Sequence, residues 1–89
     1  MSEKPEIIVY SSGFCPYCVR AKQLLERKGA AFNEIRVDHE PQEREIMETR
    51  SGRRTVPQIF IGEHHVGGYD DLAALDRAGD LDPLLGIAP

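Results

Sequence analysis

Blocks of apolar residues alternate with charged stretches along the chain, and their spacing predicts strands and helices in turn. An apolar β-branched run makes residues 6–10 a strand of the kind that is buried on both faces of a sheet. Residues 16–28 carry apolar side chains at helical spacing, and Gly29 is a natural stop after them. Residues 31–38 predict a second strand, because isoleucine and valine alternate there with charged residues. Since a helix connects the two strands, we expect them to pair in parallel as a right-handed βαβ unit.

The second half of the chain predicts a further helix, a hairpin and a last helix. Residues 41–50 contain few apolar positions, but the charge order around them suits a helix dipole: Glu40, Glu43 and Glu45 come early, and Arg50, Arg53 and Arg54 come late. The remaining predicted elements are strands over residues 56–61 and 64–67, a helix over 71–78 after a candidate N-cap at Asp70, and a short turn over 81–85. The order βαβαββα, read as one domain over residues 1–89, predicts an α/β fold. Its four-stranded mixed sheet would be flanked by helices on both faces.

Composition and charge narrow the class of partner. The chain is 40% hydrophobic and carries 15 acidic and 11 basic residues, so its net charge of −4 gives no general attraction to nucleic acid or to an anionic membrane. Basic side chains do cluster at Arg50, Arg53 and Arg54, where favourable charge at a helix C-terminus and an anion-binding role are both open. The polar N-terminal residues and the short apolar run after them fit neither a signal peptide nor a membrane helix. We therefore expect a cytoplasmic protein.

The candidate chemistry lies in the two cysteines, Cys15 and Cys18, which are spaced Cys-x-x-Cys between the first strand and the first helix. Thiolates are the reactive form of cysteine, and the free N–H groups and positive dipole at a helix N-terminus stabilise such a charge. Pro16 suits the first helical position because its missing N–H costs nothing there. Cys18 lies one turn deeper and should be more buried. We predict a redox pair with Cys15 attacking and Cys18 resolving.

Two other interpretations of the cysteines stay open at this point. A structural disulfide is one, although a reducing cytosol disfavours it. Half of a zinc site is the other, in which the remaining ligands would come from His39, His64 or His65. His64 and His65 are adjacent, however, so on a strand they point to opposite faces and cannot both reach one metal. The redox interpretation is favoured.

Three motifs in order resemble a dithiol glutaredoxin of the small bacterial type. They are YSSGFCPYC at residues 10–18, TVPQIFI at residues 55–61 and GGYDDL at residues 67–72. The resemblance covers nearly the whole chain and implies a thioredoxin fold. It also implies glutathione as co-substrate, with no metal, in the reduction of protein disulfides and protein–glutathione mixed disulfides.

The resemblance implies that the Val56–Pro57 peptide bond is cis and lies beside Cys15. The alternative is a strand whose hydrogen-bond ladder starts only after Pro57, since proline is poorly tolerated inside a central strand. With a cis bond, the backbone of Val56 could pair with glutathione as another strand would, next to Thr55. Tyr17 is expected to form a wall of the groove, exposure on the helix surface being the alternative.

The same resemblance implies a site for the two ends of glutathione. Gly68, Tyr69 and Asp71 open a helix together with Asp70, and free N–H groups there can hold the γ-glutamyl carboxylate. The alternative is that Asp70 only caps the helix. Capping would explain the presence of Asp70, but it explains Asp71 less well. Arg53 could hold the glycine carboxylate or lie solvated on the surface.

One position departs from the family pattern. Many glutaredoxins carry a lysine where this chain has Ser12, so the helix terminus must do more to stabilise the thiolate or Arg53 must compensate.

Two other functions stay open. In the first, the protein receives electrons from thioredoxin reductase and donates them to ribonucleotide reductase. In the second, it carries an iron–sulfur cluster that bridges a dimer through Cys15 and glutathione. The expected partners are glutathione and glutathionylated or disulfide-containing proteins, ribonucleotide reductase among the candidates, and the expected state is a monomer.

Overall fold

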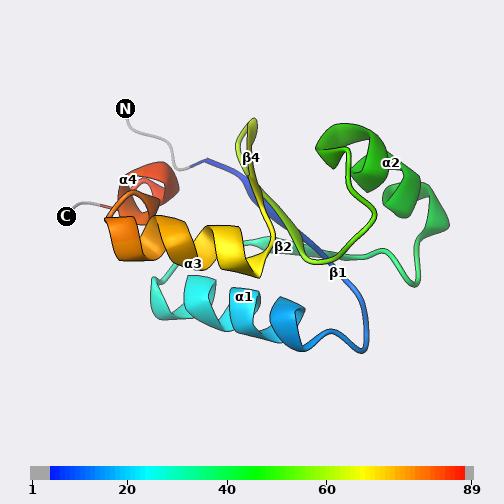
Figure 1. Ribbon diagram of the computed structural model, residues 1–89, viewed down its shortest axis with the longest axis horizontal. Coiled ribbons are helices and arrows are strands. Elements are labelled where there is room, and N and C mark those ends of the chain that lie inside the picture. The colour runs from blue at the N-terminus through cyan, green and yellow to red at the C-terminus, as the bar shows by residue number, and fades with distance from the viewer. Residues whose placement is uncertain (1–4, 88–89) are drawn as a thin grey trace.

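The computed structural model describes residues 5–87. Its elements alternate as the sequence predicts, with one short helix added at the end (Figure 1). They are β1 (Ile7–Ser11), α1 (Pro16–Arg27), β2 (Asn33–Arg36), α2 (Pro41–Ser51), β3 (Gln58–Ile61), β4 (His64–Gly67), α3 (Tyr69–Ala78) and α4 (Leu81–Leu85). Within the described residues, no helix has the length and apolar character needed to cross a membrane.

The four strands form one mixed sheet in the order β2-β1-β3-β4. β1 pairs in parallel with β2, as the helical crossover predicts, and antiparallel with β3. β3 and β4 form the predicted hairpin, with a register irregularity between Ile59 and Phe60. The parallel pair and the hairpin therefore meet at the centre of the sheet, between β1 and β3.

One face of the sheet is covered by α1, α3 and α4 (Figure 1). Leu25 from α1, Leu72 from α3 and Leu85 from α4 pack there against Val9 and Ile59 of the central strands, and all five are almost fully buried. This cluster is the larger of the two hydrophobic cores, and it holds the N-termini of α1 and α3 on the same side of the sheet.

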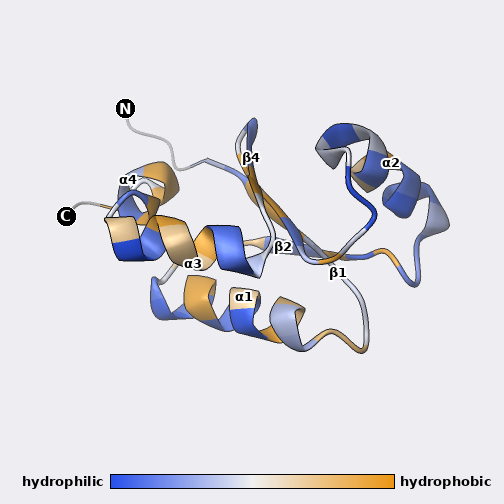
Figure 2. Cartoon of the chain, in the orientation of Figure 1, coloured by the Kyte–Doolittle hydropathy of each residue, from blue (hydrophilic) through white to orange (hydrophobic). Residues whose placement is uncertain are grey.

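The other face is covered by α2, which is mostly hydrophilic in Figure 2. Met47 is fully buried against Tyr10, Val37 and Phe60, whereas Ile46 next to it is 44% exposed. A helix with so few apolar positions is thus attached largely by one methionine. Helices on both faces of the sheet confirm the predicted α/β architecture.

Several element boundaries differ from the prediction: β2 is two residues shorter at each end than the predicted strand over 31–38, and other ends move by one or two residues. Two of the differences have a local reason. β3 begins at Gln58 and not at residue 56, because Pro57 has no N–H for the ladder. α3 begins at Tyr69 with Gly68 as its N-cap, so the expected cap at Asp70 was wrong. The carboxylate of Asp71 instead accepts a hydrogen bond from the Gly68 N–H at 3.0 Å.

Candidate active site

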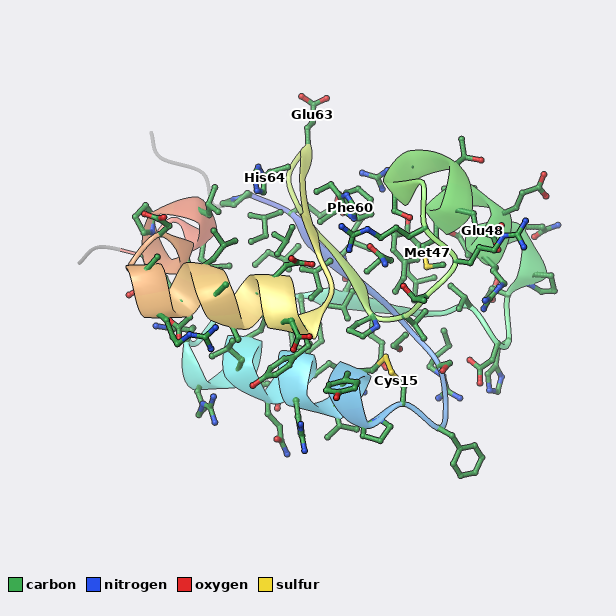
Figure 3. The ribbon with its side chains drawn as sticks, in the orientation of Figure 1. Cys15, Met47, Glu48, Phe60, Glu63 and His64 are labelled. Carbon is green, nitrogen blue, oxygen red and sulfur yellow. A yellow bond between two sulfur atoms is a disulfide. The ribbon has the colours of Figure 1, made fainter. Side chains whose placement is uncertain are left out.

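Cys15 and Cys18 form a disulfide at the N-terminus of α1, with their Cα atoms 5.1 Å apart (Figure 3). Cys15 is the N-cap residue and Pro16 follows in the first turn, as expected from the sequence. The Cys15 Sγ accepts a hydrogen bond from the Cys18 N–H at 3.1 Å. Cys18 is 1% exposed and Cys15 is half-buried, which confirms the predicted difference between an accessible and a deeper sulfur.

The loop before β3 lies against this disulfide. The Val56–Pro57 peptide bond is cis, as the resemblance implied, and the Val56 carbonyl oxygen lies 3.7 Å from the Cys15 Sγ. Pro57 is buried. The side chain of a residue at position 68 would meet the Pro57 carbonyl oxygen at 3.6 Å, so Gly68 brings the start of α3 up against the same loop. Three segments far apart in the sequence thus meet at one end of the sheet.

A cavity of about 210 Å³ opens between these segments. Its lining consists of Tyr17, Arg53, Thr55, Val56, Pro57, Gln58, Gly68, Tyr69, Asp70 and Asp71. All nine residues that the sequence assigned to a glutathione site are therefore brought together around one cavity. Gln58 is the additional residue, and the sequence offered a signal for it: a polar side chain directly after Pro57 in an otherwise apolar strand.

Two tyrosines define one side of the cavity. The rings of Tyr17 from α1 and Tyr69 from α3 stack with their centroids 6.2 Å apart and their planes 24° apart. The guanidinium of Arg20 lies 5.4 Å from the centre of the Tyr17 ring. Tyr17 lines the cavity and is also 53% exposed on the surface of α1, so the two alternatives considered for it from the sequence both hold.

Of the three clustered arginines, Arg53 is the one that lines the cavity. Its Nη1 lies 3.3 Å from the same Asp71 oxygen that caps Gly68. Arg50 instead places its guanidinium 4.1 Å from the centre of the Phe60 ring, and Arg54 extends into solvent. Asp71 thus couples the start of α3 to the loop that carries Arg53. The capping role that the sequence had assigned to Asp70 belongs to Asp71.

The loop before Cys15 is held by β2 and the residues that follow it. Arg36 donates two hydrogen bonds to the carboxylate of Asp38, at 2.9 and 2.7 Å, and the Gly13 N–H donates a third at 3.1 Å. These bonds, that from Arg36 first, hold the pKa of Asp38 far below its usual range. A side chain at Gly13 would collide with the Arg36 guanidinium. These bonds, which we call the Arg36–Asp38 clamp, fix the backbone of Gly13, which lies two residues before Cys15 and next to Ser12.

An accessible sulfur at a helix N-terminus with a second sulfur beneath it is the arrangement that thiol–disulfide exchange requires, and it lies here on a thioredoxin fold. The chain is therefore a thiol–disulfide oxidoreductase by fold and site. A sequence model of the glutaredoxin family matches residues 7–66, more than half of the chain. The chain belongs to the glutaredoxin family.

Several glutaredoxins are similar to this chain over most of its length. It is 57% identical over 81 residues to a glutaredoxin of Pseudomonas aeruginosa, which covers 91% of this chain and 96% of the relative. It is also 57% identical over 77 residues to glutaredoxin 3 of Escherichia coli, with 86% and 93% coverage. Among solved structures, a glutaredoxin from Brucella melitensis superposes with a TM-score of 0.83 at 56% identity, over 94% of this chain and 91% of the other. A buckwheat glutaredoxin–glutathione complex superposes with a TM-score of 0.85 at 35% identity, over 94% and 83%.

Proposed function

We propose that this protein uses glutathione to reduce protein–glutathione mixed disulfides, with Cys15 as the nucleophile. The observation that carries the proposal is the position of the Cys15 Sγ, 3.7 Å from the carbonyl of a residue that lines the 210 Å³ cavity. A peptide bound in that cavity has its own sulfur within reach of Cys15. The buckwheat relative, whose structure is described as a glutathione complex, supports the same ligand.

In the first step, the Cys15 thiolate attacks the glutathione sulfur of the mixed disulfide. The old disulfide bond breaks, the substrate leaves as a thiolate, and glutathione stays bound to Cys15. A second glutathione thiolate then attacks that glutathione sulfur, which releases glutathione disulfide and the Cys15 thiolate. The Cys18 N–H, 3.1 Å from the Cys15 sulfur, stabilises the charge that returns there.

Protein disulfides require the second sulfur. The Cys15 thiolate attacks one sulfur of the substrate disulfide and forms a mixed disulfide with the substrate. Cys18 then attacks the Cys15 sulfur, releases the reduced substrate, and leaves the Cys15–Cys18 disulfide for glutathione to reduce. The 5.1 Å separation of the two Cα atoms suits this intramolecular step. Phe14, fully exposed beside Cys15, offers substrate proteins an apolar contact.

Glutathione would lie in the cavity in an extended conformation. The backbone of Val56 pairs with its peptide groups, and the first N–H groups of α3 hold the γ-glutamyl carboxylate. Arg53 takes the glycine carboxylate, and Tyr17 covers the chain between the two ends. Because Arg53 is 51% exposed and its Asp71 partner 49% exposed, their ion pair is weak and does not compete strongly with a ligand carboxylate.

Reduction of a glutathionylated peptide by the wild type, Cys15→Ser and Cys18→Ser tests this function. NADPH would recycle the protein through glutathione reductase and glutathione, or in parallel through thioredoxin reductase. We expect turnover with glutathione, its loss in Cys15→Ser and its survival in Cys18→Ser. Turnover with thioredoxin reductase alone would contradict the proposal and favour an electron donor to ribonucleotide reductase. Turnover with neither, together with visible absorbance after anaerobic purification, would favour the iron–sulfur carrier.

A further inference from the structure

Gln58 is a fully buried amide whose hydrogen bonds connect the active-site loop to the far edge of the sheet. It lies on β3 directly after Pro57 and is 0% exposed. Its Nε2 donates to the backbone oxygen of Thr55 at 3.0 Å and to the Thr55 hydroxyl at 3.2 Å. Its Oε1 lies 2.7 Å from Nε2 of His65 on β4. Every polar atom of this buried side chain is thereby engaged.

The direction of these bonds assigns a role to His65. The Thr55 carbonyl can only accept, so the amide nitrogen of Gln58 must face Thr55 and its oxygen must face the imidazole. An acceptor oxygen at 2.7 Å requires that Nε2 of His65 carries a proton and donates it. Without that donor, the buried Gln58 oxygen would have no partner, and the side chain would be held against Thr55 by its nitrogen alone. The imidazole thus completes the network that holds the amide against Thr55.

His65 is itself held in one position. Its ring stacks on Phe60 with the centroids 4.8 Å apart and the planes 26° apart. Burial is the main cause that lowers the pKa of His65, and the positive charge of Arg53 adds to it. The negative charge of Asp71 raises the pKa of His65, whereas His64 and Arg50 lower it further. The lowered pKa favours the neutral ring, which carries a single proton, and the contact with the Gln58 oxygen puts that proton on Nε2.

We propose that His65 is a positioning residue for the glutathione site, acting through Gln58 on Thr55. Thr55 directly precedes Val56 and Pro57, and all three line the cavity beside Cys15. The inference rests on the proposed function, because it takes the cavity to be where glutathione binds. His65 touches neither sulfur, so its effect is on the shape of the binding loop and not on the nucleophile.

The test compares His65→Phe with His65→Gln in the reduction of a glutathionylated peptide. Phenylalanine keeps the stacking on Phe60 but lacks the donor, so we expect the KM for the peptide to rise about three- to tenfold with kcat nearly unchanged. Glutamine supplies an N–H donor and should restore most of the wild-type KM. His64→Phe is the matched control: His64 is exposed, lies beside the hairpin tip in Figure 3, and should keep the wild-type KM.

A double-mutant cycle with Gln58→Met separates positioning from a general loss of stability. If His65 acts only through Gln58, His65→Phe should raise the KM in the wild type and have no further effect in the Gln58→Met background. Equal effects in both backgrounds, an unchanged KM in His65→Phe, or no recovery in His65→Gln would each overturn the inference. Failure of the proposed function would be distinct, because the wild type itself would then show no glutathione-dependent turnover. The rate of Cys15 alkylation should be the same in all variants.

Discussion

Replacing Gly67 by alanine should disturb the proposed glutathione site, although Gly67 itself does not line the cavity. Gly67 has φ of 113°, a region that alanine enters at a cost of about 1 kcal/mol. A Cβ there would also collide with the carboxylate of Asp71 and lie 3.2 Å from Nη1 of Arg53. The carboxylate would have to turn away and give up its bond to the Gly68 N–H, and loss of such a cap costs about 1 kcal/mol more.

Gly79→Ala is the matched control. Gly79 has φ of 80° and ends α3, but a Cβ there would meet no atom within 4 Å. It should therefore show the backbone cost alone, about 1 kcal/mol, or a fall in Tm of about 4–8 °C for a domain of this size. Gly67→Ala should lose about twice as much.

Thermal unfolding and steady-state reduction of a glutathionylated peptide would be measured on both variants. We expect Gly67→Ala to raise the KM about tenfold, because the displaced Asp71 no longer orders the start of α3 and the Arg53 loop. Gly79→Ala should keep the wild-type KM despite its lower Tm. An equal loss of Tm in both variants, with neither KM changed, would refute the link between the Asp71 cap and the binding site.

Three further predictions concern other parts of the molecule. Cys18→Ser should reduce a glutathionylated peptide but fail with a protein disulfide, since no second sulfur releases the substrate. Met47→Ala should lower the free energy of unfolding in urea by about 2–5 kcal/mol, because this fully buried side chain attaches most of α2 to the sheet. Asp38→Asn should be less stable than the wild type at neutral pH, and the difference should shrink as the pH falls below the ordinary carboxyl pKa of 3.8. The sign follows because a carboxylate with a lowered pKa stabilises the fold only while it is ionised.

Each of these predictions has a contrary outcome. A Cys18→Ser variant that still reduces protein disulfides would remove the resolving role from Cys18. Ile46→Ala, at a position 44% exposed, should cost less than about 0.5 kcal/mol, and an equal loss at both positions would contradict the packing of α2 through Met47. If the difference in stability between Asp38→Asn and the wild type stayed the same across the acid range, ionisation of Asp38 would add nothing to stability.

The elements that the sequence predicts well are those whose signal is local. The amphipathic spacing from Cys18 to Leu25 and the Cys-Pro pair at its start define α1 by themselves, and the structure agrees. The lining of the cavity was predictable through family motifs, because Tyr17, Val56 and Gly68 come from three separate segments and no local pattern joins them.

The features that the sequence missed depend on contacts across the sheet. Asp70 and Asp71 are adjacent and chemically identical, and only the path of the chain at Gly67 and Gly68 decides that Asp71 forms the cap. His65 was considered as a metal ligand, but its hydrogen-bond partner is Gln58 across the β3–β4 hairpin. A side chain's partner on another strand is set by register, which apolar alternation alone does not specify.

Val56 follows Cys15 by 41 positions in the sequence, and this separation has a consequence for the order in which the chain is synthesised. Both thiols, and the helix that activates them, emerge well before the loop and the third helix that surround a bound tripeptide. A chain that ends before β3 contains both cysteines but lacks Gln58 and the four residues at the start of α3 that complete the lining of the cavity. The cavity is complete only when β3 pairs with β1 and brings the start of α3 beside the loop at Val56. On the proposed function, the second half of the chain therefore adds selectivity for glutathione to a pair of cysteines supplied by the first half.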